Sequence, residues 1–290
     1  MPHAKFNITS GPGGRIMSVD SERVEECMRV FQEQAMAGIH ISSLGAYKSD
    51  NVEFLREHPE VVTVFVSDGK GIDLHGLTYL TNLEHLTLGH YDAPIDLTCF
   101  PRLKTFSGEW SAGLGLGDAC KSLRSLTLSK YKAPDLETFP CIRSISELEL
   151  IQPSIASLAG IERHTHIKKL QFFRCLQLTS IGAIAGLKNG DVDYIAFRQC
   201  KKIMDIESLG ELSRVKNLTL ETCGAVRSLD FLLGCQKLEG VGFFETDVLD
   251  GDLSPLLQLP RLSFVGMSEK RHFSHTRLEI NRLLNANREA

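Results

Sequence analysis

Two histidines close together in the sequence are the clearest candidates for metal chemistry. His85 and His90 lie in one short apolar-polar segment, and Glu109 and Glu147 occur at nearby positions of later segments of the same kind. Imidazole and carboxylate groups are suitable zinc ligands, so these side chains could form the site of a metal-dependent enzyme. The alternative is that they are polar residues on a solvated surface. We favour that alternative and predict no metal ligands.

Eight cysteines are spread along the chain without a CxxC pair. Two groups of three recur at equivalent places in a repeated pattern: Cys175, Cys200 and Cys223, and Cys99, Cys120 and Cys141. A metal or redox role would require nearby histidines or paired cysteines. We therefore interpret both groups as columns of buried thiols.

Two glycine-rich segments resemble phosphate loops only superficially. The segment Gly11–Gly14 lacks the Lys-Ser/Thr ending of such a loop, and no long helix follows Gly113–Gly117. We predict a turn at the first and a loop at the second. Because no nucleophile, base and orienting acid can be assembled either, we predict no enzyme, no catalytic residues and no cofactor.

Composition excludes several classes of protein. The chain has 290 residues, 42% of them hydrophobic and 23% charged, and a net charge of −4. A globular, mildly acidic chain of this kind does not favour nucleic-acid binding, which needs a basic face. No apolar run approaches the length that spans a bilayer, and the N-terminus lacks the pattern of a Sec-type signal peptide. We predict a cytoplasmic protein with reduced thiols, with secretion by a signal-independent route left open.

A repeated sequence pattern predicts the secondary-structure elements that position the histidines, carboxylates and cysteines described above. The frame is apolar-x-x-apolar-x-apolar and recurs every 20 to 25 residues, with a weaker first copy at Met36. The ten registered copies begin at Val61, Leu83, Leu103, Leu123, Ile145, Ile167, Val192, Val215, Leu238 and Leu262. The alternation at the end of each frame is typical of a short strand. Repeats of this length predict a solenoid.

Energetics explain why many copies are needed. One repeat buries about five apolar side chains, each worth roughly 1.5–3 kcal/mol. Ordering about 22 residues costs on the order of 1–2 kcal/mol apiece, so a single repeat cannot fold alone. Stacked repeats share a parallel sheet and a continuous core. Between the strands, leucines spaced by three, such as Leu74, Leu77 and Leu80, predict short 3₁₀ turns.

The flanks of the array are predicted to be caps. At the front, a hairpin around Gly11–Gly14 precedes a helix that Asp20 or Ser21 can cap. Its apolar face is predicted to carry Val24, Cys27, Phe31 and Ala35. At the back, Thr276 and Glu279 have the spacing of a capping box before Leu278, Leu283 and Leu284. We predict a cap over residues 1–35, repeats over 36–270 and a cap helix over 271–290, all in one continuous domain.

The stretch from Leu74 to Leu88, LHGLTYLTNLEHLTL, resembles the leucine-rich repeats of internalin-like bacterial proteins. The resemblance covers about residues 36 to 270. It implies an α/β solenoid, a leucine-rich-repeat horseshoe of about 10–11 parallel strands with a hairpin–helix cap and a C-terminal helical cap. The asparagine that this family usually has after each strand is replaced here. Cysteine or threonine stands there in later repeats, so the regularity of these loops is left open.

In this fold the alternate, outward strand positions form one concave face. The share of aromatic residues at these positions is about twice the 7% share in the whole chain. The six aromatic residues are Phe65, Trp110, Phe173, Tyr194, Phe244 and Phe264. Acidic and basic residues fall in bands along this face, as suits a complementary protein surface. The predicted partner-binding residues are His90, Glu109, Trp110, Lys130, Glu147, Glu149, Lys169, Gln171, Phe173, Arg174, Tyr194 and Arg198.

The leading hypothesis is a non-enzymatic protein-binding module, monomeric when free, whose partner is another protein rather than nucleic acid or membrane. One specific form is an immunity protein that neutralises a toxin. An alternative is a secreted effector that binds a host protein. A metal-dependent enzyme and a scaffold that binds through its convex face are the other hypotheses.

Overall fold

A computed structural model describes residues 6–93 and 95–289. Contacts divide it into two compact units. Unit 1 comprises Met1–Leu128 with Ile142–Ser144, and unit 2 comprises Ser129–Cys141 with Ile145–Ala290. The domain boundaries expected after residues 35 and 270 stay predictions.

Unit 1 begins with a hairpin and continues as a parallel sheet. The hairpin strands β1 (Ile8–Gly11) and β2 (Gly14–Ser18) are antiparallel, and β2 then pairs in parallel with the first repeat strand. The parallel strands that follow pair in chain order: β3 (Gly38–Ser42), β4 (Thr63–Asp68), β5 (His85–His90) and β6 (Thr105–Glu109). Strand β7 covers Ser125–Ser129. The predicted turn at Gly11–Gly14 is confirmed as the hairpin connection.

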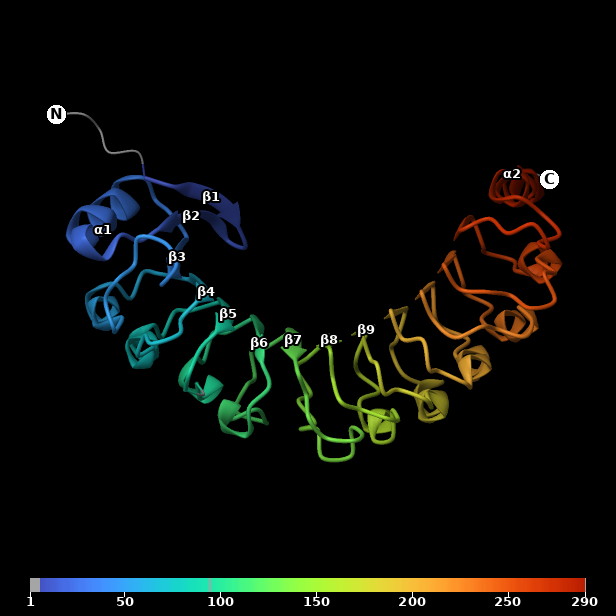
Figure 1. The fold of residues 1–290 in the computed structure, drawn as a ribbon, viewed down its shortest axis with the longest axis horizontal. Helices are drawn as coiled ribbons and strands as arrows, with labels where there is room; N and C mark the ends of the chain where they lie inside the picture. The colour runs from blue at the N-terminus through green and yellow to red at the C-terminus, as the bar shows by residue number, and fades with distance from the viewer. Residues whose placement is uncertain (1–5, 94, 290) are drawn as a thin grey trace. The chain divides into compact units, whose positions relative to one another are not determined.

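Unit 2 is a parallel sheet in which each strand pairs with the next along the chain (Figure 1). Its strands are β8 (Glu147–Ile151), β9 (Lys169–Phe173), β10 (Tyr194–Arg198), β11 (Asn217–Glu221), β12 (Gly240–Phe244) and β13 (Phe264–Met267). Equivalent apolar residues are aligned across these strands; Ile195, for example, pairs with Leu170 and with Leu218. Each repeat therefore stacks its leucine positions on those of the next.

Short 3₁₀ helices form the other side of the coil in each unit (Figure 1). Those that connect repeat strands are η2 (Glu53–Glu57), η3 (His75–Tyr79), η4 (Leu97–Cys99), η5 (Ala112–Leu114), η6 (Ile161–Arg163), η7 (Gly182–Leu187), η8 (Ile206–Glu211), η9 (Asp230–Gly234) and η10 (Ser254–Gln258), and η1 (Ser21–Arg23) precedes the first repeat strand. The expected three-residue leucine spacing is confirmed, since Leu74, Leu77 and Leu80 are all buried around η3. No helix among the described residues is long and apolar enough to cross a bilayer.

The core lies between the strands and the 3₁₀ turns. Leu86, Leu126 and Leu218, from three different repeats, are only 1%, 0% and 2% exposed. The eleven strands β3 to β13 coincide with the eleven copies of the repeated frame. The predicted α/β leucine-rich-repeat solenoid is therefore confirmed.

The N-terminal cap differs from its prediction in detail. Asp20 does act as a cap, but its side chain accepts the Glu22 amide at the start of η1 rather than of α1 (Val24–Glu33). Cys27 and Phe31 are buried in α1 as expected, together with Met28. Ala35 lies beyond the helix end with a positive φ of 45° and is exposed, so its assignment to the apolar face was wrong.

The C-terminal helix α2 (Arg277–Glu289) has the predicted capping box. The Thr276 amide donates to Glu279 Oε2 at 2.8 Å, and the Glu279 amide donates to Thr276 Oγ1 at 3.2 Å. The buried face is Ile280 and Leu284, so Leu284 is buried as predicted. Leu278 and Leu283 are 80% and 40% exposed, so their assignment to the apolar face was wrong.

Helix α2 also satisfies the free edge of β13. The Val265 amide donates to Asn281 Oδ1 at 2.9 Å, and Asn281 Nδ2 donates to the Val265 carbonyl at 2.8 Å. A side-chain amide thus supplies the donor and the acceptor that a further strand would otherwise supply.

Candidate functional site: the open face of the sheet

Strand side chains alternate between the core and solvent, and we call their solvent side the open face. On β9, Leu170 and Phe172 are buried, whereas Lys169, Gln171 and Phe173 are half-buried on the opposite side. Strands β8 and β11 alternate in the same way, and β10 differs only at Ala196, which is buried. Equivalent residues lie in rows because the strands pair in register. One such row is Glu147, Lys169, Tyr194 and Asn217.

The predicted partner-binding residues fall in both units. Three belong to unit 1: His90, Glu109 and Trp110. Nine belong to unit 2: Lys130, Glu147, Glu149, Lys169, Gln171, Phe173, Arg174, Tyr194 and Arg198. The unit 2 residues lie on β8 to β10 or in the turns that follow strands, so the structure brings these strand residues together on one face.

Arg198 is the centre of a polar network on this face. Its guanidinium donates to Gln171 Oε1 at 3.3 Å and to the Tyr194 hydroxyl at 3.2 Å. It also forms an ion pair with Glu221 at 3.5 Å, and Lys169 Nζ lies 5.4 Å from the centre of the Tyr194 ring. These contacts orient the side chains of Gln171, Tyr194 and Arg198 on the open face, and side chains that are already oriented lose less conformational entropy on binding. Glu221 was not among the predicted site residues.

The turns after strands β7 to β12 each contain one non-glycine residue in the left-handed region. Lys130 and Arg174 have φ angles of 57° and 54°. Their amides donate to Ile151 O and Arg198 O, each at 2.8 Å, and thereby extend the ladder between repeats. The equivalent residues are Gln152, Gln199, Thr222 and Glu245. The loops after the strands are therefore regular although the asparagine of the family is missing.

The predicted thiol column explains this regularity. Cys200 Sγ donates to Phe172 O at 3.6 Å, and Cys223 Sγ donates to Phe197 O at 3.3 Å, both in the preceding repeat. Thr246 Oγ1 continues the series by donating to Leu220 O at 3.1 Å. A hydrogen bond with Cys200, together with burial, raises the pKa of the Cys175 thiol, and burial raises that of Cys223 to about 12. The hydrogen bond with Cys175 lowers the pKa of Cys200. Cys175 and Cys200 are buried as predicted, Cys223 is half-buried, and the column links successive repeats through its hydrogen bonds.

The second predicted thiol column is only partly buried. Cys120 is buried, and burial raises its pKa. Cys99 and Cys141 are exposed, so the expectation that they are buried was wrong. All three cysteines occur at the ends of repeats, and the sequence there does not indicate which of the thiols are exposed to solvent.

In unit 1, the predicted residues line two adjoining recesses. His90 and Glu109 line one of about 410 Å³, together with four residues that sequence reasoning missed, Asp68, Lys70, Tyr91 and Asp92. Trp110 and Glu109 line the other, of about 170 Å³. The Tyr91 hydroxyl donates to Glu109 O at 2.8 Å, and burial with the nearby Glu109 charge raises its pKa to about 12.

The histidine–carboxylate cluster does not assemble as a metal site in the described part of the chain. His85 Nδ1 lies 2.9 Å from Thr105 Oγ1, and His90 Nδ1 lies 3.6 Å from Asp68 Oδ1. Glu147 belongs to the other unit. Among residues 6–93 and 95–289, no group of three or more His, Cys, Asp or Glu side chains is placed to hold a metal ion.

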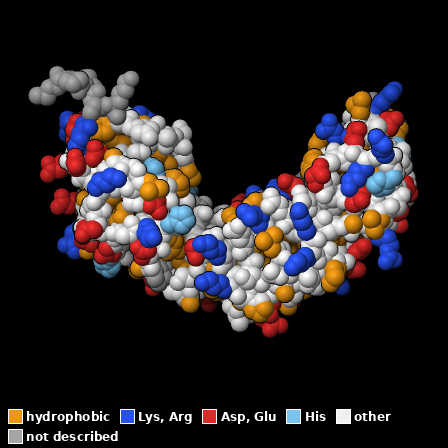
Figure 2. All heavy atoms as spheres, in the orientation of Figure 1, with side chains coloured by type: hydrophobic (Ala, Val, Ile, Leu, Met, Phe, Trp, Pro, Cys, Tyr) orange, Lys and Arg blue, Asp and Glu red, His pale blue; other side chains and the backbone are white. Residues whose placement is uncertain are grey.

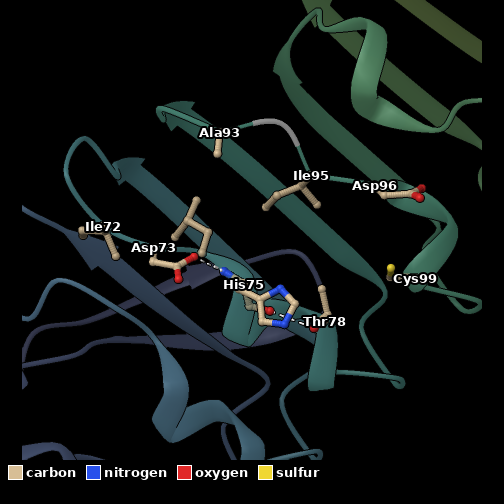
Figure 3. Close-up of a pocket in the computed structure, with 9 residues that line it drawn as sticks. Ile72, Asp73, His75, Thr78, Ala93, Ile95, Asp96 and Cys99 are labelled. Carbon is tan, nitrogen blue, oxygen red and sulfur yellow. Dashed lines mark hydrogen bonds between the residues drawn. The ribbon is translucent and has the colours of Figure 1, made fainter.

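A pocket of about 360 Å³ lies on the 3₁₀ side of unit 1 (Figure 3). Its walls include Ile72, Leu74 and Ile95. Its polar groups are engaged in local turns, since Asp73 Oδ1 accepts the His75 amide at 2.9 Å and the Thr78 hydroxyl donates to His75 O at 2.8 Å. The segment Gly113–Gly117, predicted to be a loop, begins within the short 3₁₀ helix η5 and continues at Gly115 with a φ of 60°.

Acidic and basic side chains are interspersed over the visible surface of each unit (Figure 2). Near the open face of unit 2, the basic residues Lys169, Arg174 and Arg198 lie between Glu149 and Glu221 along the order of the strands. The bands expected from the sequence therefore follow the order of the strands, and their role in binding stays a prediction.

Comparison with solved structures finds leucine-rich-repeat proteins. The internalin InlF of Listeria monocytogenes is 12% identical, with 89% of this chain and 83% of that chain covered and a TM-score of 0.50. The functional domain of InlJ from Listeria monocytogenes, described as including a cysteine ladder, is 14% identical, with 85% of this chain and 50% of that chain covered and a TM-score of 0.56. No protein-family model and no curated protein matches the sequence. At these identities the likeness concerns the fold, and this chain has a leucine-rich-repeat fold that resembles that of internalins.

Proposed function

We propose that this chain is a protein-binding module whose partner docks on the open face of unit 2. The observation that carries the proposal is the fixed network of Gln171, Tyr194, Arg198 and Glu221. Tyrosine and arginine are the residue types that most often dominate protein interfaces. In this network they are already positioned, and their remaining exposed surface is directed to solvent.

The mixed charge of the face favours a protein over a nucleic acid. Binding to a polyphosphate backbone draws on a continuous basic surface. Here Arg198 is paired with Glu221 at 3.5 Å. On the neighbouring strands β8 and β9, Glu147 lies beside Lys169 and Glu149 lies beside Gln171. Alternating charges of this kind set specificity between proteins and increase the rate of encounter.

The test is affinity capture with variants of the intact chain. Phe173→Ala and Tyr194→Ala shorten two half-buried side chains of the open face. Phe231→Ala on η9 is the matched control, because this aromatic is also half-buried but lies on the 3₁₀ side. We expect a protein that wild type and Phe231→Ala retain and that both open-face variants lose.

Loss of the captured protein with Phe231→Ala alone would instead favour a scaffold that binds through its other side. Trp110→Ala, in unit 1, extends the test to the recess that Trp110 and Glu109 line. We expect the double variant Trp110→Ala, Phe173→Ala to bind the partner more weakly than wild type, with an unchanged midpoint of unfolding.

A narrower proposal is a cytoplasmic, monomeric immunity protein that neutralises a toxin. Its support is a mildly acidic chain of net charge −4, whose eight cysteines are all free thiols, as in reducing compartments. Co-expression with the captured partner tests it, because protection of the host cell is expected only for a toxin. A captured host-cell protein would favour a secreted effector, and stoichiometric zinc lost with His85→Ala would favour an enzyme.

A further inference from the structure

Two aromatic rings at the C-terminal end of the open face rest on glycine backbone. Gly242 and Gly266 are buried and pair in register between β12 and β13. A methyl group at Gly242 would come within 2.9 Å of the Phe244 ring. One at Gly266 would come within 2.6 Å of the Phe244 ring and 3.3 Å of the Phe264 ring. The rings therefore fill the space that side chains at these two positions would take.

The outer surfaces of these rings are open to solvent. Phe244 is 37% exposed and Phe264 is 59% exposed. Shielding of glycine backbone accounts for the inner faces of the rings, since aromatics often pack on glycines in sheets. This shielding does not explain why more than half of the Phe264 side chain is exposed. Exposing an aromatic side chain to water costs free energy, and burial in an interface would recover it.

Three acidic residues are near Phe244 in the sheet register or in the turns that follow β12 and β13. Glu221 is its cross-strand neighbour in the register of β11 and β12. Glu245 follows it directly, and its amide donates to Ser268 Oγ at 3.2 Å, next to Glu269. Of the nearby cations, Arg198 is paired with Glu221 at 3.5 Å and Lys270 with Asp247 at 3.1 Å. Glu269 Oε1 also accepts the Arg277 amide at 3.1 Å. The carboxylates of Glu245 and Glu269 are therefore the acidic groups that a cation at these rings would meet without displacing Arg198 or Lys270.

We propose that Phe244 and Phe264 form a binding site for an arginine side chain of the partner protein. A guanidinium stacks on an aromatic face, whose electron density attracts it, and carboxylates at the edge provide charge-assisted hydrogen bonds. The aliphatic part of the arginine covers the second ring. This inference rests on the proposed function, because it names the chemistry of the segment that the partner brings to the face.

A labelled peptide tests the site on the intact chain without the natural partner. Fluorescence anisotropy is measured at low salt with a short arginine-containing peptide and with the same peptide carrying citrulline, the neutral isostere. We expect the arginine peptide to bind about tenfold more tightly, and Phe264→Ala to weaken it by about five- to thirtyfold. Glu245→Gln combined with Glu269→Gln should weaken it to a similar degree and flatten its salt dependence.

The matched control is Phe65→Ala, because Phe65 is an open-face aromatic of unit 1 that is 38% exposed. It should leave the affinity unchanged. Equal affinity for the citrulline peptide, or equal losses in Phe65→Ala and Phe264→Ala, would overturn the proposal. If Phe264→Ala does not fold, Phe264→Leu removes the ring and keeps apolar volume, and unaltered affinity in that variant would likewise overturn it.

The outcome separates this inference from the proposed function. If open-face variants such as Phe173→Ala lose the captured protein while the peptide shows no preference for arginine, only the arginine site is wrong. If the arginine preference depends on Phe264 but no captured protein depends on Phe173 or Tyr194, the proposed docking surface is wrong and the arginine site stands.

Discussion

Acidification should destabilise this protein through His164, a buried imidazole in the loop before β9. The residue is 2% exposed, and its Nε2 atom has no hydrogen-bond partner among the described residues. Its ring packs edge-on against Phe139, with centroids 5.7 Å apart. Burial, assisted by the charges of Arg163 and His166, lowers its pKa from 6.5 to about 4. The folded chain therefore holds this ring in its neutral form.

The sign and size of the effect follow from proton linkage. An unfolded chain takes up a proton on this histidine as the pH falls through 6.5, whereas the folded chain resists until about pH 4. The contribution to stability is fully present above pH 6.5 and is lost as the pH falls toward 4. The complete loss is about 3 kcal/mol, and about 2 kcal/mol of it should be lost by about pH 5.

The assay compares urea unfolding of wild type and His164→Phe at about pH 7.5 and about pH 5. Phenylalanine keeps an aromatic ring against Phe139 and removes the titrating group. We expect the variant to lose about 2 kcal/mol less than wild type over this range. His90→Gln is the control, because the His90 side chain is 79% exposed, and it should follow wild type. Equal losses of stability in wild type and His164→Phe would mean that His164 does not cause the acid destabilisation.

Three further predictions concern the core, the turns and the thiols. Leu126→Ala should lower the free energy of unfolding by about 2–5 kcal/mol through a cavity in the core, and an unshifted denaturant midpoint would mean that the side chain is not packed as described. Thr222→Gly should raise the free energy of unfolding by about 0.5–1 kcal/mol, because it removes the steric strain of a β-branched residue at a φ of 53°. This gain outweighs the added flexibility of glycine in the unfolded chain. A lower free energy of unfolding in the same urea titration would contradict this prediction. Iodoacetamide should label Cys99 and Cys141 rapidly in the folded protein and leave Cys200 protected, as mass spectrometry can determine, and early labelling of Cys200 would argue against the thiol column.

Much of the fold could be predicted because the repeated frame reports directly on burial. Leucine positions such as Leu86 and Leu218 recur at a fixed place in each copy, and each is buried. The caps were harder, because a single helix has no second copy to confirm its apolar face. Leu278 has the residue type of a core position, yet the hydrogen bonds of Asn281 to β13 fix a rotation of α2 that leaves Leu278 exposed.

The site could be predicted only as a face. Alternation places Phe244 and Phe264 on the same side as Phe173, but it does not reveal that their rings lie over Gly242 and Gly266, since that depends on the neighbouring strand. The left-handed turns were also beyond prediction. Their residues, such as Thr222, are not the glycines that usually indicate a positive φ, and the hydrogen bond to the next repeat holds them there.

Hydroxyl-radical footprinting of the chain, alone and with its captured partner, shows directly which side of unit 2 the partner covers. Binding to the open face of unit 2 predicts that Phe173, Tyr194 and Phe244 lose reactivity in the complex. Phe231 and Met204, which lie off that face, should react as before. Protection of Phe231 and Met204 with unchanged reactivity at Phe173 and Tyr194 would mean that the partner does not dock on the open face.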